Sequence, residues 1–199
     1  GDSRYISYSC SVTPRSTVIK VYDRKTKKIH QITDSVSHDY AAVFDPTGKY
    51  LYFLSKRVFN PVYDDIQFEL GFPRGSQPFV VTLAKDTPSP FIKEAESYTK
   101  APKPKNDKKK KNDKKPEVLE VKIDFEGIQD RILTFPVSEG LYSDIGAVKG
   151  KVFYTVSQVE GSRRAPWYDL VPVAKNTLKV FDFEEQKEKT FLSSVTDFK

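Results

Sequence analysis

The chain has 199 residues, of which 38% are hydrophobic and 13% aromatic, a share large enough for a packed core. No run of about 18 apolar residues occurs and the first residues lack a signal-peptide pattern, so neither a membrane-spanning segment nor a leader is expected. The single cysteine, Cys10, excludes an internal disulfide and leaves the redox compartment open.

The positive charge of the chain is concentrated in one tract. The net charge is +6, and residues 100–116 alone hold nine lysines against Asp107 and Asp113, which leaves the remainder close to neutral. Such a tract cannot bury enough apolar surface to offset the entropy of ordering, so we expect a disordered insertion. A basic arm for RNA or an acidic membrane surface is the alternative. Because the tract lacks arginine and interleaved aromatic residues, neither nucleic acid nor a membrane is an expected partner.

The first predicted strands lie in residues 2–33. They read DSRYISYSC from Asp2 and STVIKVYDRKTKKIHQIT from Ser16. The second segment is apolar up to Tyr22, passes through a charged turn, and continues through Ile29 to Ile32. This pattern predicts antiparallel strands joined by a hairpin.

A turn followed by a buried strand is predicted in DPTGKYLYFLSKR, residues 45–57. The Asp45 side chain can accept backbone N–H donors of a type I turn. The following proline fixes the φ angle at the second position of this turn, and Gly48 closes the turn. The run after the turn is aromatic and aliphatic throughout, which indicates a strand covered on both faces. A buried helix segment is the alternative, but the run is short and rich in β-forming residues.

Residues 55–75, SKRVFNPVYDDIQFELGFPRG, form a connection that is long for one between two strands. Long ordered loops on a rigid scaffold often carry binding residues. We therefore select Arg57, Phe59 and Arg74 as candidate contacts for a peptide or a subunit.

Two further segments flank the lysine tract. The strand SQPFVVTLAKDTPSPF begins at Ser76, and EVLEVKIDFEGIQDRILTFPV begins at Glu117. The second segment predicts a hairpin that turns at residues 125–127. Arg131 is expected to form an ion pair inside its own sheet.

The last predicted strands are VKGKVFYTVS from Val148 and NTLKVFDFEEQKEKTFLS from Asn176. Between them lies EGSRRAPWYDLVP, which brings two arginines next to two large aromatic residues. Arginine, tryptophan and tyrosine are enriched at binding hot spots, and arginine pairs well with carboxylates. The candidate contacts in this segment are Arg163, Arg164, Trp167 and Tyr168. The alternative is that the aromatic residues only fix the loop on its own sheet.

The strands repeat. The segments from Asp2, Pro46 and Val148 align, and each is followed by a further strand. A unit of about 40–45 residues built from four antiparallel strands is typical of a β-propeller blade. We predict an all-β chain with about three blades of a partial propeller: blades in 1–99, the insertion in 100–116 and further blades in 117–199. A closed propeller needs at least four blades, so the chain is expected to be part of a longer polypeptide.

Catalytic and metal-binding patterns are missing from the sequence. There is no G-x-S-x-G elbow and no phosphate-binding loop. His30 and His38 lack neighbours at metal-ligand spacing, and Asp64 and Asp65 lack the alternation of a calcium loop. We therefore expect no catalytic residue, no metal and no cofactor in this chain.

A family resemblance rests on specific runs. Residues 21–91, followed by the lysine-rich insertion and IDFEGIQDRILTFPV, closely resemble the amino-terminal propeller region of tricorn proteases and their bacterial homologues. The order of LAKDTPSPF and DFEGIQDR is the more specific part, because TolB-type propellers share the shorter strand patterns.

The resemblance implies a role. Tricorn proteases are large serine peptidases that assemble as hexamers and trim short peptides, with catalytic groups in a separate carboxy-terminal region. It implies that this chain is a non-catalytic propeller segment that guides peptides or supports assembly, with the rest of the polypeptide and further copies as partners. It also implies the cytoplasm, with a periplasmic or exported protein as the alternative. An independent interaction propeller of the TolB or WD type is the alternative function.

Overall fold

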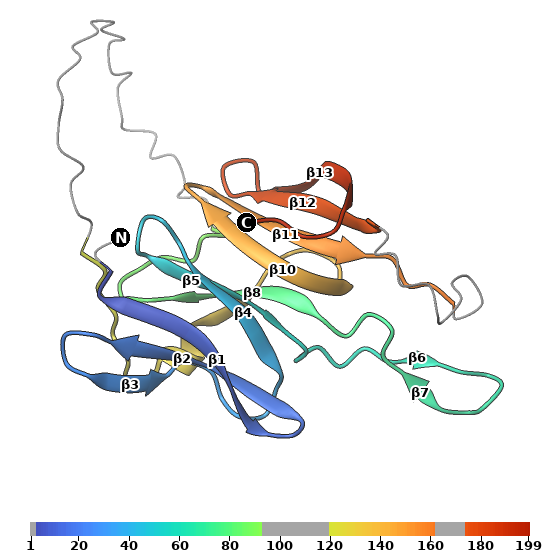
Figure 1. Ribbon diagram of the computed structural model, residues 1–199, viewed down its shortest axis with the longest axis horizontal. Helices are drawn as coiled ribbons and strands as arrows, with labels where there is room; N and C mark the ends of the chain where they lie inside the picture. The colour runs from blue at the N-terminus through green and yellow to red at the C-terminus, as the bar shows by residue number, and fades with distance from the viewer. Residues whose placement is uncertain (1–2, 93–119, 162–173) are drawn as a thin grey trace, which may run out of the picture.

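The computed structural model describes residues 3–92, 120–161 and 174–199. These residues form antiparallel strands and one short 3-10 helix. The strands make three larger sheets that lie side by side and one two-stranded sheet (Figure 1). In each sheet the strands are ordered as they occur along the chain. The predicted all-β class and the antiparallel meanders are confirmed. The expected insertion at 100–116 lies outside the described residues.

The elements have the following bounds. The first sheet contains β1 (Tyr5–Thr13), β2 (Ser16–Asp23) and β3 (Lys28–Gln31). The second sheet contains β4 (Asp39–Phe44), β5 (Tyr50–Ser55), β8 (Gln77–Thr82) and β9 (Ile132–Thr134). The third sheet contains β10 (Leu141–Val148), β11 (Lys151–Ser157), β12 (Asn176–Asp182) and β13 (Lys187–Val195). A small hairpin is made by β6 (Val62–Tyr63) and β7 (Leu70–Gly71), and the 3-10 helix η1 (Ile128–Arg131) precedes β9.

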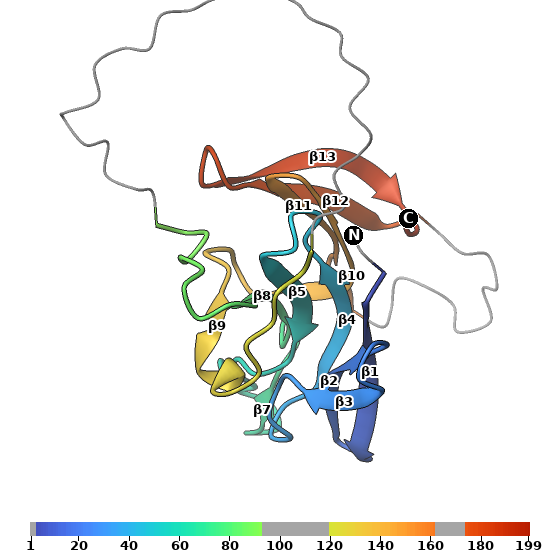
Figure 2. The same ribbon diagram turned by 90° about the vertical axis from the view of Figure 1, so that its left-hand side faces the viewer.

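The repeat found in the sequence is a repeat of structure. The three aligned segments become β1, β5 and β11, and each pairs with the next large strand, β2, β8 or β12. The second sheet lies between the other two, because β4 contacts β1 and β2 on one side and β10 on the other (Figure 2).

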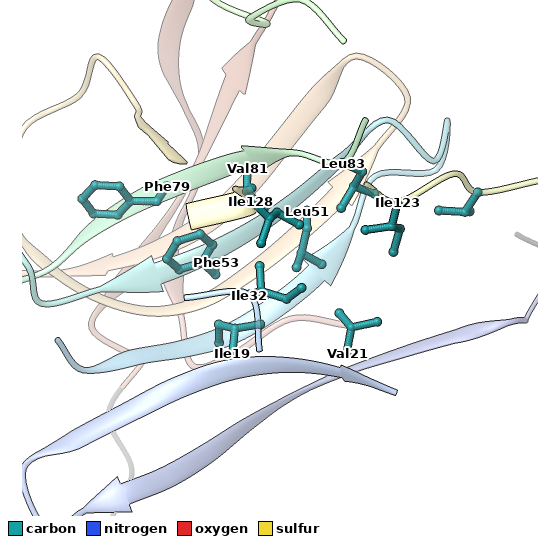
Figure 3. Packing of buried hydrophobic residues seen from close by; sticks show 11 residues of the cluster. Ile19, Val21, Ile32, Leu51, Phe53, Phe79, Val81, Leu83, Ile123 and Ile128 are labelled. Atoms are coloured by element: carbon teal, nitrogen blue, oxygen red, sulfur yellow. The ribbon is translucent and has the colours of Figure 1, made fainter. Parts of the chain in front are cut away.

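Two apolar layers fill the spaces between the sheets. Successive side chains of β5 point to opposite faces, as in any strand. Leu51 and Phe53 therefore pack in the layer toward the first sheet, while Tyr52 and Leu54 pack in the layer toward the third. Figure 3 shows the first layer, in which residues of β2, β5 and β8 point toward one another. Burial of β5 on both faces explains why its sequence is apolar throughout.

The turn before β5 has the predicted chemistry. The backbone N–H of Gly48 donates to the carbonyl of Asp45 at 2.9 Å, and the Asp45 carboxylate accepts the N–H of Thr47 at 3.1 Å. Gly48 has φ of +71°, a left-handed conformation that favours glycine. The turn is thus fixed by the residues that predicted it.

The hairpin predicted at residues 125–127 is wrong. Residues 120–124 form no strand, and the chain turns at 125–127 into η1. Val121 and Ile123 are buried in the first apolar layer, so this segment covers the edge of the core instead of pairing with β9.

Arg131 forms hydrogen bonds to backbone carbonyls and not the ion pair that was expected. Its guanidinium donates to the carbonyls of Thr82 at 3.1 Å, Leu83 at 3.3 Å and Glu126 at 3.1 Å, and also to that of Asp124. The residue does act inside its own sheet, but it binds backbone carbonyls where an ion pair was predicted.

Candidate functional site: a cleft at the base of a hairpin arm

The connections singled out in the sequence emerge from one end of the sheets. The β5–β8 connection and the β11–β12 connection each join the second strand of a four-stranded sheet to the third, so they leave neighbouring sheets at the same end (Figure 1). Backbone hydrogen bonds of 2.9 and 3.2 Å between Ser76 and Gly140 join the start of β8 to the start of β10 at this end.

The β11–β12 connection is described only at its two ends. Its described parts are residues 158–161 and 174–175, where Lys175 pairs with Glu160 at 2.7 Å. The candidate contacts Arg163, Arg164, Trp167 and Tyr168 lie outside the described residues.

Arg57 lies at the first of these connections and is held by a buried acid. Its guanidinium donates to the Asp39 carboxylate at 2.9 Å and to the Ser55 hydroxyl at 3.0 Å. It also lies over the rings of Phe53 and Phe79, with centroid distances of 5.5 and 5.1 Å. The Asp39 side chain is fully excluded from solvent, and that of Arg57 is 19% exposed. The charge of Arg57 is thus already matched, and the residue fixes the start of the connection.

The β5–β8 connection contains a hairpin arm, residues 60–72, and two phenylalanines meet at the base of this arm. Phe59 lies where the chain enters the arm and Phe72 where it leaves, and their ring centroids are 5.3 Å apart. Phe59 is 78% exposed and Phe72 46%. Arg74 is exposed between Pro73 and Gly75 and stands beside this pair in sequence.

A cleft of about 530 Å³ opens between this base and the sheets. Its apolar wall includes Val58, Phe59, Phe72 and Leu141, and Lys56 and Arg57 lie along it. The remaining lining residues are Val36, Ser37, Gly75 and Ser76. The cleft thus combines apolar side chains with an exposed cation, Lys56. Such a combination can accept a ligand that has an apolar group next to a carboxylate.

The floor of the cleft is tied to the third sheet. The buried Ser76 hydroxyl donates to the carbonyl of Gly140 at 2.7 Å and accepts the N–H of Tyr142 at 3.1 Å. The Tyr40 hydroxyl donates to the Tyr142 carbonyl at 2.8 Å, and burial raises the pKa of Tyr40 above its ordinary value. These bonds hold β4, β8 and β10 in fixed positions under the cleft.

The sequence missed the part of the cleft that comes from other sheets. Val36 and Ser37 belong to the connection between β3 and β4, and Leu141 begins β10. They reach the cleft only because the sheets pack side by side, and no local pattern in the sequence marks them. Arg57 and Phe59, in contrast, were selected from the sequence and do line it.

The two histidines have structural neighbours. The His38 Nδ1 atom lies 3.0 Å from the Thr17 hydroxyl, and the His30 ring stacks on Phe125 at 3.6 Å between centroids. Within residues 3–92, 120–161 and 174–199, no three His, Cys, Asp or Glu side chains are grouped so as to hold a metal ion. The same residues contain no helix that could cross a membrane.

Comparison with known proteins identifies the family. The family model described as the tricorn protease second beta propeller domain matches residues 1–199. The chain belongs to this family of tricorn propeller domains. A tricorn protease homolog 1 of Streptomyces coelicolor is 32% identical over 94% of the chain, and a tricorn protease of Thermoplasma volcanium is 28% identical over all of it.

A solved structure agrees. The crystal structure of the tricorn protease superposes with a TM-score of 0.75 and 25% identity over 98% of this chain, which is 18% of the other. This confirms the tricorn resemblance and the propeller fold. The chain spans about a fifth of the length of the curated relatives that it matches.

Proposed function

We propose that this tricorn propeller domain is a non-catalytic segment of a serine peptidase and that its cleft contacts peptides on their way to or from the peptidase region. The observation that carries the proposal is the cleft itself. It is open to solvent, has an apolar wall and places Lys56 at its edge. A free peptide offers an apolar side chain and a terminal carboxylate, which match these two features.

The role of Lys56 follows from its neighbour. Arg57 is committed to Asp39 by a short, buried ion pair, so its charge is not available to a ligand without loss of that pair. Lys56 is exposed, and its backbone N–H donates to the carbonyl of His38 at 3.0 Å, which fixes the backbone of this lining residue. We assign carboxylate contact to Lys56 and place the apolar contact at Phe59 and Phe72.

The test uses the complete polypeptide that carries this chain and measures cleavage of short fluorogenic peptides. Lys56→Glu is expected to raise KM for peptides with a free carboxylate by on the order of tenfold and to leave kcat unchanged. The matched control is Lys28→Glu, which reverses an exposed charge on β3. Amidation of the peptide should abolish the difference between Lys56→Glu and the unaltered protein.

Two results would refute the proposal. Equal KM values for the two variants would refute the carboxylate contact assigned to Lys56, and with it the proposed binding of peptides in the cleft through their free carboxylate. A complete polypeptide without any peptidase activity would instead favour the independent interaction propeller.

A further inference from the structure

The hairpin arm, residues 60–72, extends away from the three sheets (Figure 1). Within the described part of the chain, its strands pair only with each other, Val62 with Gly71 and Tyr63 with Leu70. The arm nevertheless carries several large exposed apolar side chains, namely Val62, Tyr63, Ile66, Phe68 and Leu70. An isolated two-stranded hairpin is marginal in water, and clustered exposed apolar residues mark an interaction surface.

The tip of the arm uses a turn that occurs three times among the residues that the structure describes. Asp64 accepts the N–H of Phe68 through its carbonyl at 2.8 Å, and its carboxylate accepts the N–H of Ile66 at 2.8 Å. The same two contacts are made by Asp23, between β2 and β3, and by Asp182, between β12 and β13. The turns at Asp23 and Asp182 can therefore be compared directly with the turn at the tip of the arm.

Phe68 differs in residue type from the residues at the same position of the other two turns. The fifth residue of each turn is left-handed, with φ of 60° at Lys27, 58° at Gln186 and 55° at Phe68. A left-handed backbone disfavours large side chains, and Lys27 and Gln186 are at least polar and flexible. Phe68 contacts the ring of Tyr63 at 6.5 Å between centroids but remains 74% exposed. Neither its backbone nor its burial within this chain favours a phenylalanine there.

The charge of the arm narrows the choice of partner. Residues 62–71 contain Asp64, Asp65 and Glu69 and no lysine or arginine. An acidic tip is repelled by anionic lipid headgroups and attracted by a basic surface. The matching surface is therefore apolar in its centre and lined with basic residues.

We propose that the hairpin arm docks, through Ile66 and Phe68, on an apolar surface with a basic rim in the part of the complete polypeptide outside this chain. Relatives are about five times longer than this chain, so most of the surface available to the arm lies there. A hairpin that reaches away from its own sheets is suited to such a contact because it can enter a pocket of another domain. The proposal rests on family membership and not on peptide binding in the cleft, so either can fail alone.

The first test is site-specific photo-crosslinking in the complete polypeptide. Ile66, which is 87% exposed, is replaced by p-benzoylphenylalanine, and the products are separated by mass and mapped by mass spectrometry. The expected product has the mass of one polypeptide and joins position 66 to residues outside this chain. A product of two polypeptides would assign the arm to a second copy and overturn the proposal. Crosslinks that join position 66 only to residues of this chain, or no crosslinked product at all, would overturn it as well.

The second test changes the anomalous residue. Phe68→Gln introduces the residue found at the same turn position in Gln186, so the turn itself is retained. It is expected to reduce crosslinking at position 66 on the order of tenfold. The matched control, Lys27→Gln, alters the equivalent turn and should leave this crosslinking unchanged. Equal behaviour of the two variants would overturn the proposal.

Discussion

The guanidinium of Arg57 lies 2.9 Å from the carboxylate of Asp39, whose side chain is wholly buried. Asp39 begins β4 and Arg57 follows β5, so this pair joins the first strand of the second sheet to the start of the connection that forms the arm. The Ser55 hydroxyl donates to the second carboxylate oxygen and receives the Nε–H of Arg57. The orientation of the arm base thus depends on a compact polar network.

Loss of Arg57 is expected to destabilise the protein strongly. Arg57→Met would leave the buried Asp39 carboxylate without its partner, and breaking such a pair lowers the free energy of unfolding by roughly 3–5 kcal/mol. Urea unfolding of the purified protein measures the change. Lys56→Met is the matched control, because it removes an exposed cation next in sequence and should cost at most about 0.5 kcal/mol. Equal midpoints for the two variants would contradict the role given to this pair.

The two turn glycines Gly48 and Gly150 should differ in their tolerance of alanine. Both have left-handed φ angles, +71° and +78°, so Gly150→Ala is expected to cost about 1–2 kcal/mol from backbone strain alone. An added Cβ at Gly48 would also lie 3.0 Å from Val121, whereas at Gly150 it meets nothing within 4 Å. Gly48→Ala should therefore be the more destabilising variant in thermal unfolding. Equal destabilisation by the two variants would show that Val121 moves aside at no cost.

Acid should weaken the ion pair between Lys151 and Asp182. A hydrogen bond from the Lys151 ammonium, with backbone N–H donors of Glu184 and Glu185, holds the pKa of Asp182 below its ordinary value. Because the folded pKa is the lower one, the stabilisation is complete above about pH 4 and is lost as the pH falls through the folded value. The Tm difference between the unaltered protein and Asp182→Asn should shrink from pH 6 to pH 2.5. A constant difference would be inconsistent with this linkage.

Three buried tyrosines should resist ionisation in the folded protein. Burial raises the pKa of Tyr52, Tyr142 and Tyr154 above the ordinary value near 10. At pH 11 the folded protein should therefore show at least three fewer phenolates, by absorbance at 295 nm, than the same protein in urea. A single transition near pH 10 that includes all eleven tyrosines would contradict this expectation.

Local sequence patterns predicted the parts of the fold that local chemistry controls. The turn at Asp45, the two-faced burial of β5 and the repeat of β1, β5 and β11 follow from residue type and period. The segment at residues 120–131 was misread because its apolar residues serve the core layer and not a ladder. Periodicity alone cannot distinguish these two uses of an apolar run.

The sequence by itself determined the fold class, the family and two of the residues that line the cleft, because these depend on patterns within short segments. Only the tertiary structure decided that Arg57 forms an ion pair with Asp39 and that Leu141 and Ser37 complete the cleft. It also revealed that Phe68 has an unfavourable backbone where two equivalent turns carry polar residues. These features depend on distances between residues far apart in sequence or on dihedral angles, which are fixed only when the sheets pack together.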